Sequence, residues 1–145
     1  MSQIEDFLSE KEEGEIVAAI RAAELNTSGE IRVHIEKSTE GNALDRAKEV
    51  FYFLKMDKTS AKNGVLFYLG VEDKKFAILG DKGIDALVEE DFWDSIRDTV
   101  ITAFKQNDYA GGLIQGITSA GLKLKHYFPF TPEDVDELPN TISKG

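Results

Sequence analysis

The sequence contains no cysteine, which excludes a disulfide framework, a thiolate nucleophile and a cysteine zinc site. Basic residues are also scarce, because 17 Lys and Arg stand against 27 Asp and Glu, giving a formal net charge of −10 at pH 7. A field of that sign repels phosphate backbones and anionic lipids. We therefore do not expect nucleic acid or a membrane surface as a partner.

Long apolar runs are missing as well. The longest is residues 64–71, whereas a membrane-spanning helix needs about 20 apolar residues. The first residues are acidic and lack the apolar core and cleavage site of a secretion signal. These features predict a monomeric, cytoplasmic protein without membrane insertion. A chain of 145 residues is long enough for one domain with a single core.

Four segments carry apolar residues at the spacing typical of core-facing helices. A capping box formed by Ser9 and Glu12 predicts where the first helix begins. Asn107 and Asp108 can cap the last helix, which Pro129 ends. The predicted helices cover residues 9–25, 43–56, 92–104 and 109–126.

Three segments read as strands. Strict alternation over Glu30–Glu36 predicts a strand with one exposed face, which includes His34. Residues 65–71 are apolar at successive positions, as expected for a central strand covered on both faces. A short polar turn then leads into residues 75–79, which predicts an antiparallel hairpin. The helix between the first two strands makes that pair a parallel, right-handed unit.

The element order is helix, strand, helix, strand, strand, helix, helix. It predicts an α/β fold in which a small mixed β-sheet is sandwiched between α-helices. Residues 1–128 form one domain with an N-terminal helix. Residues 129–145 form an acidic, partly flexible tail, which Leu138 and Ile142 can anchor to the body.

Catalytic patterns are hard to find. The chain has only two histidines, His34 on a predicted strand and His126 at a helix end, and neither has an obvious serine or cysteine partner. We interpret His34 as an exposed strand residue and His126 as a complement to the helix dipole. No phosphate-binding loop or dinucleotide fingerprint occurs in the sequence.

Carboxylates are the remaining candidates, and oxygen ligands suit Ca²⁺ or Mg²⁺. The predicted topology brings the starts of the first two strands and the end of the third to one edge of the sheet. Asp81 and Asp85 follow the third strand in a glycine-flanked loop whose carbonyls can complete an oxygen shell. Glu89 is close in sequence, and Glu30 and Asn63 begin the neighbouring strands. These five residues are the predicted metal ligands.

Two of these residues also have purely structural interpretations. Asp81, beside glycines, can simply serve the turn. Glu89 and its acidic neighbours Glu90 and Asp91 can simply stabilise the start of the next helix. A further acidic pair, Glu72–Asp73, is flanked by lysines and reads as solvated turn charges.

Several short motifs resemble those of the TPM domain family, and their order and spacing make the resemblance fairly specific over residues 27–128. The motifs are TSGEIRV (27–33), NGVLFYL (63–69), VEDKKF (71–76), GDKGI (80–84) and NDYAGGL (107–113). The resemblance implies a compact α/β sandwich, divalent metal binding by acidic loop residues and an acid phosphatase activity. Asp81 stands where many relatives have an aromatic residue, and Lys62 where they often have an acid.

Three hypotheses follow from the sequence. The first is a module that binds Ca²⁺ or Mg²⁺ and has a regulatory or protein-interaction role, with an unknown protein partner. The second is a metal-dependent acid phosphatase in which Asp81 is the nucleophile or base. The third is a protein-interaction module that needs no metal.

Overall fold

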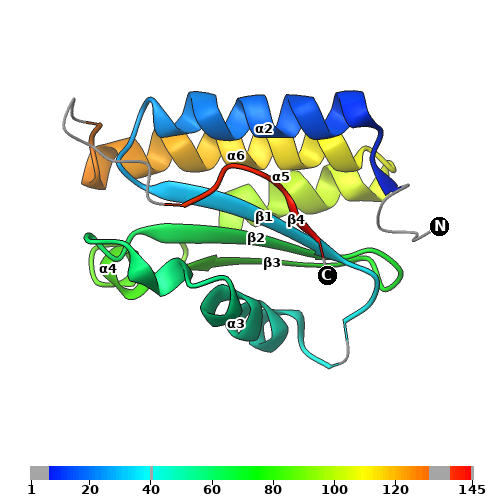
Figure 1. Cartoon of the computed structure of the whole chain (residues 1–145), viewed down its shortest axis with the longest axis horizontal. Helices are drawn as coiled ribbons and strands as arrows, with labels where there is room; N and C mark the ends of the chain where they lie inside the picture. The colour runs from blue at the N-terminus through cyan, green and yellow to red at the C-terminus, as the bar shows by residue number, and fades with distance from the viewer. Residues whose placement is uncertain (1–6, 40, 131–137, 145) are drawn as a thin grey trace.

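The computed structural model describes residues 7–39, 41–130 and 138–144 (Figure 1). Its helices are α2 (Glu10–Glu24), α3 (Ala43–Phe53), α4 (Lys82–Asp85), α5 (Asp94–Lys105) and α6 (Tyr109–Tyr127), with a 3₁₀ turn η1 (Met56–Lys58). Its strands are β1 (Glu30–Glu36), β2 (Gly64–Gly70), β3 (Lys75–Gly80) and β4 (Ser143–Lys144).

The strands form one mixed sheet in the order β3-β2-β1-β4. β1 and β2 are parallel, and β2 and β3 are antiparallel, which confirms the predicted crossover and hairpin. The sheet lies between two helical layers, as Figure 1 shows: α2, α5 and α6 cover one face, and α3 covers the other. The predicted α/β sandwich is therefore confirmed.

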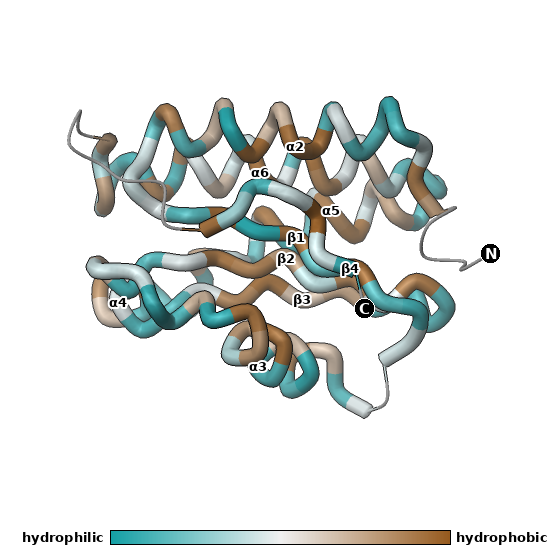
Figure 2. The backbone as a smooth tube through the Cα atoms, in the orientation of Figure 1, coloured by the Kyte–Doolittle hydropathy of each residue, from teal (hydrophilic) through white to brown (hydrophobic). Residues whose placement is uncertain are grey.

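Each face of the sheet has its own apolar core. Ile31, Val33 and Ile35 of β1 pack with residues of α2, α5 and α6 in the larger core. Leu66 and Tyr68 of β2 pack with α3 and η1 in the smaller one. Figure 2 shows the apolar stretches of the sheet between the helical layers. β2 contributes side chains to both cores, which confirms the prediction that its unbroken apolar run belongs to a central strand covered on both faces.

The helix caps agree with the sequence. Ser9 and Glu12 form the reciprocal capping box at the start of α2. Asp108 caps α6 by accepting a hydrogen bond from the backbone N–H of Gly111 at 3.0 Å. α5 begins at Asp94 rather than at the predicted residue 92, and α3 ends at Phe53 with η1 following it.

The prediction that β1 has an exposed face is wrong. His34 is 4% exposed, and Glu30 and Glu36 are also buried. The C-terminal segment and α3 bury these side chains: Leu138 contacts Glu30, Ser143 of β4 lies opposite His34 and contacts its ring, and Arg46 of α3 binds Glu36. Alternation in the sequence identified the two faces of β1 correctly, but it did not reveal what covers the polar one.

Three elements were not predicted, the 3₁₀ turn η1, the short helix α4 and the edge strand β4. The tail residues that can anchor the chain do so: Leu138 is 7% exposed, and Ile142 packs against the larger core. The rest of the predicted tail, residues 131–137 and 145, lies outside the described residues. Within the described part of the chain, no helix combines the length and apolarity needed to cross a membrane.

Candidate cation site and a buried polar network

The edge of the sheet where β3 ends brings distant parts of the chain together. The backbone N–H of Asp81 donates to the carbonyl of Gly64 at 2.9 Å. The N–H of Glu30 donates to the carbonyl of Asn63 at 3.2 Å. These bonds confirm that the starts of β1 and β2 and the end of β3 share one edge.

Asp81 lies at the N-cap of α4, between β3 and the helix. Its Oδ1 accepts a hydrogen bond from the backbone N–H of Lys82 at 2.8 Å. Its Oδ2 is buried and has no hydrogen-bond partner among the described residues, and the residue is only 5% exposed. Burying a carboxylate oxygen away from water without a partner costs free energy. A hydrogen-bond donor or a cation beside Asp81 Oδ2 would offset this cost.

Asp85 is one helical turn beyond Asp81, and the N–H of Asp85 donates to the carbonyl of Asp81 at 3.1 Å. Partial burial raises the pKa of Asp85, and the negative charge of Asp81 raises it further. The structure therefore brings two of the predicted ligands together on one face of α4.

Two glycines allow the backbone around this pair to pack closely against its neighbours. A Cβ on Gly83 would lie 2.3 Å from the carbonyl oxygen of Ala61 and 2.4 Å from that of Lys62. A Cβ on Gly80 would lie 2.8 Å from a ring carbon of Trp93. The backbone of α4 thus packs directly on the loop before β2, whose carbonyl oxygens face it. Glycine is needed at both positions for this close approach.

The other three predicted ligands have different surroundings. The carboxylate of Glu30 accepts a hydrogen bond from the backbone N–H of Leu138 and so binds the C-terminal segment. Asn63 is only 2% exposed, and its side-chain amide donates a hydrogen bond to Ser28 Oγ at 3.4 Å. Glu89 is exposed in the stretch between α4 and α5. Over the described ranges, no group of three or more acidic or histidine side chains is spaced to hold a metal ion.

A second polar cluster, which we call the Glu36 network, lies at the other end of β1. Glu36 accepts hydrogen bonds from Arg46 Nε at 2.8 Å, from Arg46 Nη2 at 2.9 Å and from the hydroxyl of Tyr68. The ring Nε2 of His34 lies 3.1 Å from Glu36 Oε1, and its Nδ1 lies 2.9 Å from Ser143 Oγ. Sequence reasoning missed this network because its members come from β1, α3, β2 and β4.

The electrostatics of the network follow from its burial. Burial favours the neutral form of Glu36, but the hydrogen bonds from Arg46, Tyr68 and His34 outweigh it and lower the pKa of Glu36 to about 2. Burial and the hydrogen bond to Glu36 raise the pKa of Tyr68 to about 12. Burial lowers the pKa of His34, and Glu36 only partly opposes that shift. At neutral pH the network therefore contains one carboxylate, one guanidinium and a neutral imidazole.

The tautomer of His34 is set by its neighbours. The carboxylate of Glu36 can only accept hydrogen bonds, so the proton of the neutral ring is on Nε2. Ser143 then donates its hydroxyl proton to Nδ1. This contact ties β4 to β1 through side chains as well as through the backbone.

Comparison with known proteins agrees with this fold. The sequence model of the TPM domain matches residues 1–122. The structure is similar to the NMR structure of the BA42 protein from the psychrophilic bacterium Bizionia argentinensis, with a TM-score of 0.93, 57% sequence identity and complete coverage of both chains. No curated protein matches the sequence.

Two more distant structures show the same fold. The N-terminal domain of a protein from P. gingivalis has a TM-score of 0.66 at 20% sequence identity, and the match covers 84% of this chain and 79% of that domain. The N-terminal domain of the cg2496 protein from Corynebacterium glutamicum has a TM-score of 0.63 at 15% identity, with coverages of 95% and 80%. The family-model match, together with the 57% identity to BA42, shows that this chain belongs to the TPM domain family.

Proposed function

We propose that the chain is a divalent-cation-binding module in which Asp81 and Asp85 supply the carboxylate ligands. The observation that carries the proposal is the buried Oδ2 of Asp81, which has no hydrogen-bond partner among the described residues. A cation beside this atom would replace the missing partner. It would also offset the repulsion from Asp81, which adds to the effect of burial in raising the pKa of Asp85.

The number of carboxylates bears on the choice of ion. Mg²⁺ is commonly held by one or two carboxylates and keeps several waters, whereas Ca²⁺ takes about 6–8 oxygen ligands. A site built on Asp81 and Asp85 therefore suits Mg²⁺ with a water-completed shell. Ca²⁺ would need further oxygens, for which the carbonyls of the loop before β2 are the nearest backbone source.

The proposed role of the ion is to fix α4 and the stretch that follows it. This stretch carries the exposed side chains Leu87 and Glu89, which are available for a contact with another protein. Cation binding would then change how firmly this surface is held. In this sense the module is regulatory.

The test is a titration with MgCl₂ and, separately, with CaCl₂, followed by backbone amide shifts. We expect saturable movement centred on residues 80–91 and a rise in the unfolding free energy of about 2.7 kcal/mol at a hundredfold excess over Kd. Asp81→Asn keeps the N-cap but removes the charge, and it should abolish both effects. Asp98→Asn, an exposed position on α5, is the matched control and should respond like the unmodified protein.

The other hypotheses from the sequence have distinct outcomes in the same experiment. If neither ion moves residues 80–91, the proposal is wrong and a metal-free interaction module becomes the better account. The acid phosphatase hypothesis rests on family resemblance, and no contact among the described residues favours it over cation binding. Turnover of an aryl phosphate that requires Mg²⁺ and disappears in Asp81→Asn would add catalysis to the same site.

A further inference from the structure

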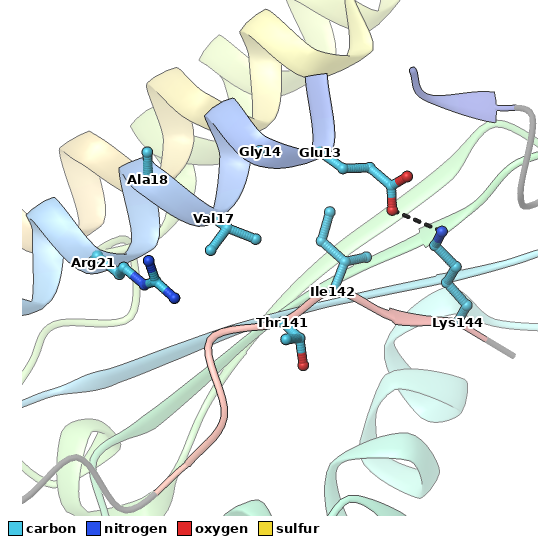
Figure 3. Close-up of a pocket in the computed structure, with 8 residues that line it drawn as sticks. All are labelled: Glu13, Gly14, Val17, Ala18, Arg21, Thr141, Ile142 and Lys144. Carbon is cyan, nitrogen blue, oxygen red and sulfur yellow. Dashed lines mark ion pairs between the residues drawn. The ribbon is translucent and has the colours of Figure 1, made fainter. Parts of the chain in front are cut away.

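A groove of about 540 Å³ runs between α2 and the C-terminal segment. Figure 3 shows Val17 and Arg21 of α2 on one side and Thr141, Ile142 and Lys144 on the other. The groove has an apolar centre and charged ends. It lies between α2 and β4, away from the α4 edge where we propose the cation site.

Gly14 is the first sign that the groove is a binding surface. It lies inside α2, where glycine costs about 1 kcal/mol relative to alanine. A Cβ on Gly14 would meet no atom within 4 Å, so the packing of the described residues does not require glycine there. The missing side chain of Gly14 leaves space in the groove, and the small side chain of Ala18 leaves space one turn later.

The charges at the two ends differ. At one end, Glu13 Oε1 and Lys144 Nζ are 2.7 Å apart and neutralise each other. At the other end, Arg21 is exposed and has no ion-pair partner among the described residues. In a chain with a net charge of −10, an unpaired guanidinium beside an apolar groove favours a ligand with a carboxylate at that end.

The strand β4 sets the form of the ligand. It is an edge strand of the sheet, so within the described chain one of its long sides pairs with no other strand. An extended peptide can add to such an edge by backbone hydrogen bonds. Figure 3 shows that α2 runs from Glu13 to Arg21 while the C-terminal segment runs from Thr141 to Lys144 in the opposite sense. A peptide antiparallel to β4 would therefore place its carboxyl end beside Arg21.

The length of the groove points to a chain end. The helical rise from Gly14 to Arg21 is about 10 Å, which is the length of about three extended residues. We propose that this groove binds the C-terminal end of another protein: a short, extended, apolar segment whose terminal carboxylate pairs with Arg21. An internal segment would have to leave the groove at both ends, whereas a terminus stops at the guanidinium.

The probe for this proposal is the peptide acetyl-Ala-Val-Ile-Val with a free terminal carboxylate. It is titrated into the full chain in EDTA, so that the result does not depend on a cation, and backbone amide shifts are followed. We expect saturable shifts in α2 around Gly14 and Ala18 and in residues 141–144. The same peptide with a C-terminal amide should bind at least about tenfold more weakly.

Matched variants connect the effect to the groove. Arg21→Gln should weaken the carboxylate peptide by the same factor of about ten and leave the amide peptide unchanged, because the lost contact is the same. Lys11→Gln removes a positive charge elsewhere on α2 and should bind like the unmodified protein. Gly14→Leu should fill the groove and block both peptides, whereas its unfolding transition should stay intact because the new Cβ meets no atom within 4 Å and the rest of the side chain extends into the groove.

Three results would overturn the proposal. They are equal binding of the two peptides, an Arg21→Gln variant that binds normally, and the absence of saturable shifts at about 5 mM peptide. Shifts at the groove that depend on protein concentration alone, with dimers in sedimentation, would also contradict it by identifying a second copy as the occupant. None of these outcomes bears on the Mg²⁺ titration of residues 80–91, so the two proposals fail independently.

Discussion

Arg46 of α3 donates two hydrogen bonds to the carboxylate of Glu36 on β1, from Nε at 2.8 Å and from Nη2 at 2.9 Å. The side chain of Glu36 is 8% exposed, so its charge depends on this partner rather than on water. The pair connects α3 to β1 across the polar face of the sheet.

The first prediction concerns removal of this partner. Arg46→Met should lower the unfolding free energy by about 3 kcal/mol, because it leaves a buried carboxylate without its cation. Urea denaturation at pH 7 measures the change. Glu49→Gln is the control. It removes the other ion pair of Arg46, which is 3.5 Å long and involves an exposed carboxylate, so we expect little change in stability. Equal effects of the two substitutions would show that Glu36 does not need Arg46.

The second prediction concerns acid. The pKa of Glu36 is about 2 in the folded chain against an ordinary value of 4.5, so its contribution is fully present above pH 4.5 and is lost as pH falls toward 2. The loss amounts to up to about 3 kcal/mol. Urea midpoints measured across this range should fall more steeply for the unmodified protein than for Glu36→Gln. Parallel curves would rule out a lowered pKa at Glu36.

The third prediction concerns His34. Because burial lowers its pKa below 6.5, the stability linked to this ring is present above pH 6.5 and is lost as pH falls below that value. Long-range ¹⁵N correlation spectra at pH 7 should show a neutral ring with its proton on Nε2. A titration midpoint above 6.5 would mean that the charge of Glu36 outweighs burial.

The fourth prediction compares two glycines. Gly83→Ala should lower the unfolding free energy by about 2 kcal/mol or more, because the new Cβ would lie 2.3 Å from the carbonyl oxygen of Ala61. Gly14→Ala should raise it by about 0.5–1 kcal/mol, since it improves helix propensity and meets no atom. Thermal unfolding of both variants under one condition decides the comparison, and a stable Gly83→Ala would show that α4 can move away from the loop.

The sequence was sufficient where the determining contacts are local or follow from connectivity. The capping box at Ser9 depends on residues three positions apart, and the bond between Asp81 and the carbonyl of Gly64 follows from the antiparallel pairing of β2 and β3. The Glu36 network depends instead on Ser143, which is 109 residues from His34. No periodicity within β1 can show that so distant a segment covers it.

The candidate site divides in the same way. Asp81 and Asp85 are four residues apart, so any helical turn after β3 brings them together. Gly80 and Gly83 indicated in the sequence that the strand ends there. Glu30 starts the neighbouring strand, but a strand residue can point to either face of the sheet. Its carboxylate meets the backbone of Leu138, a contact that depends on where the tail returns and that the sequence does not encode locally.

The parallel pairing of β4 with β1 makes the last residues of the chain a cover for its first strand. Loss of residues 138–144, whether by proteolysis or by an early stop codon, would remove the contact of Leu138 with Glu30 and that of Ser143 with His34, and it would leave β1 as an open edge. Such a shortened chain would be prone to lateral association with strands of other molecules. An intact carboxyl-terminal segment therefore places the two-residue strand β4 beside part of the longer β1 edge, and short edge strands are less prone to such association.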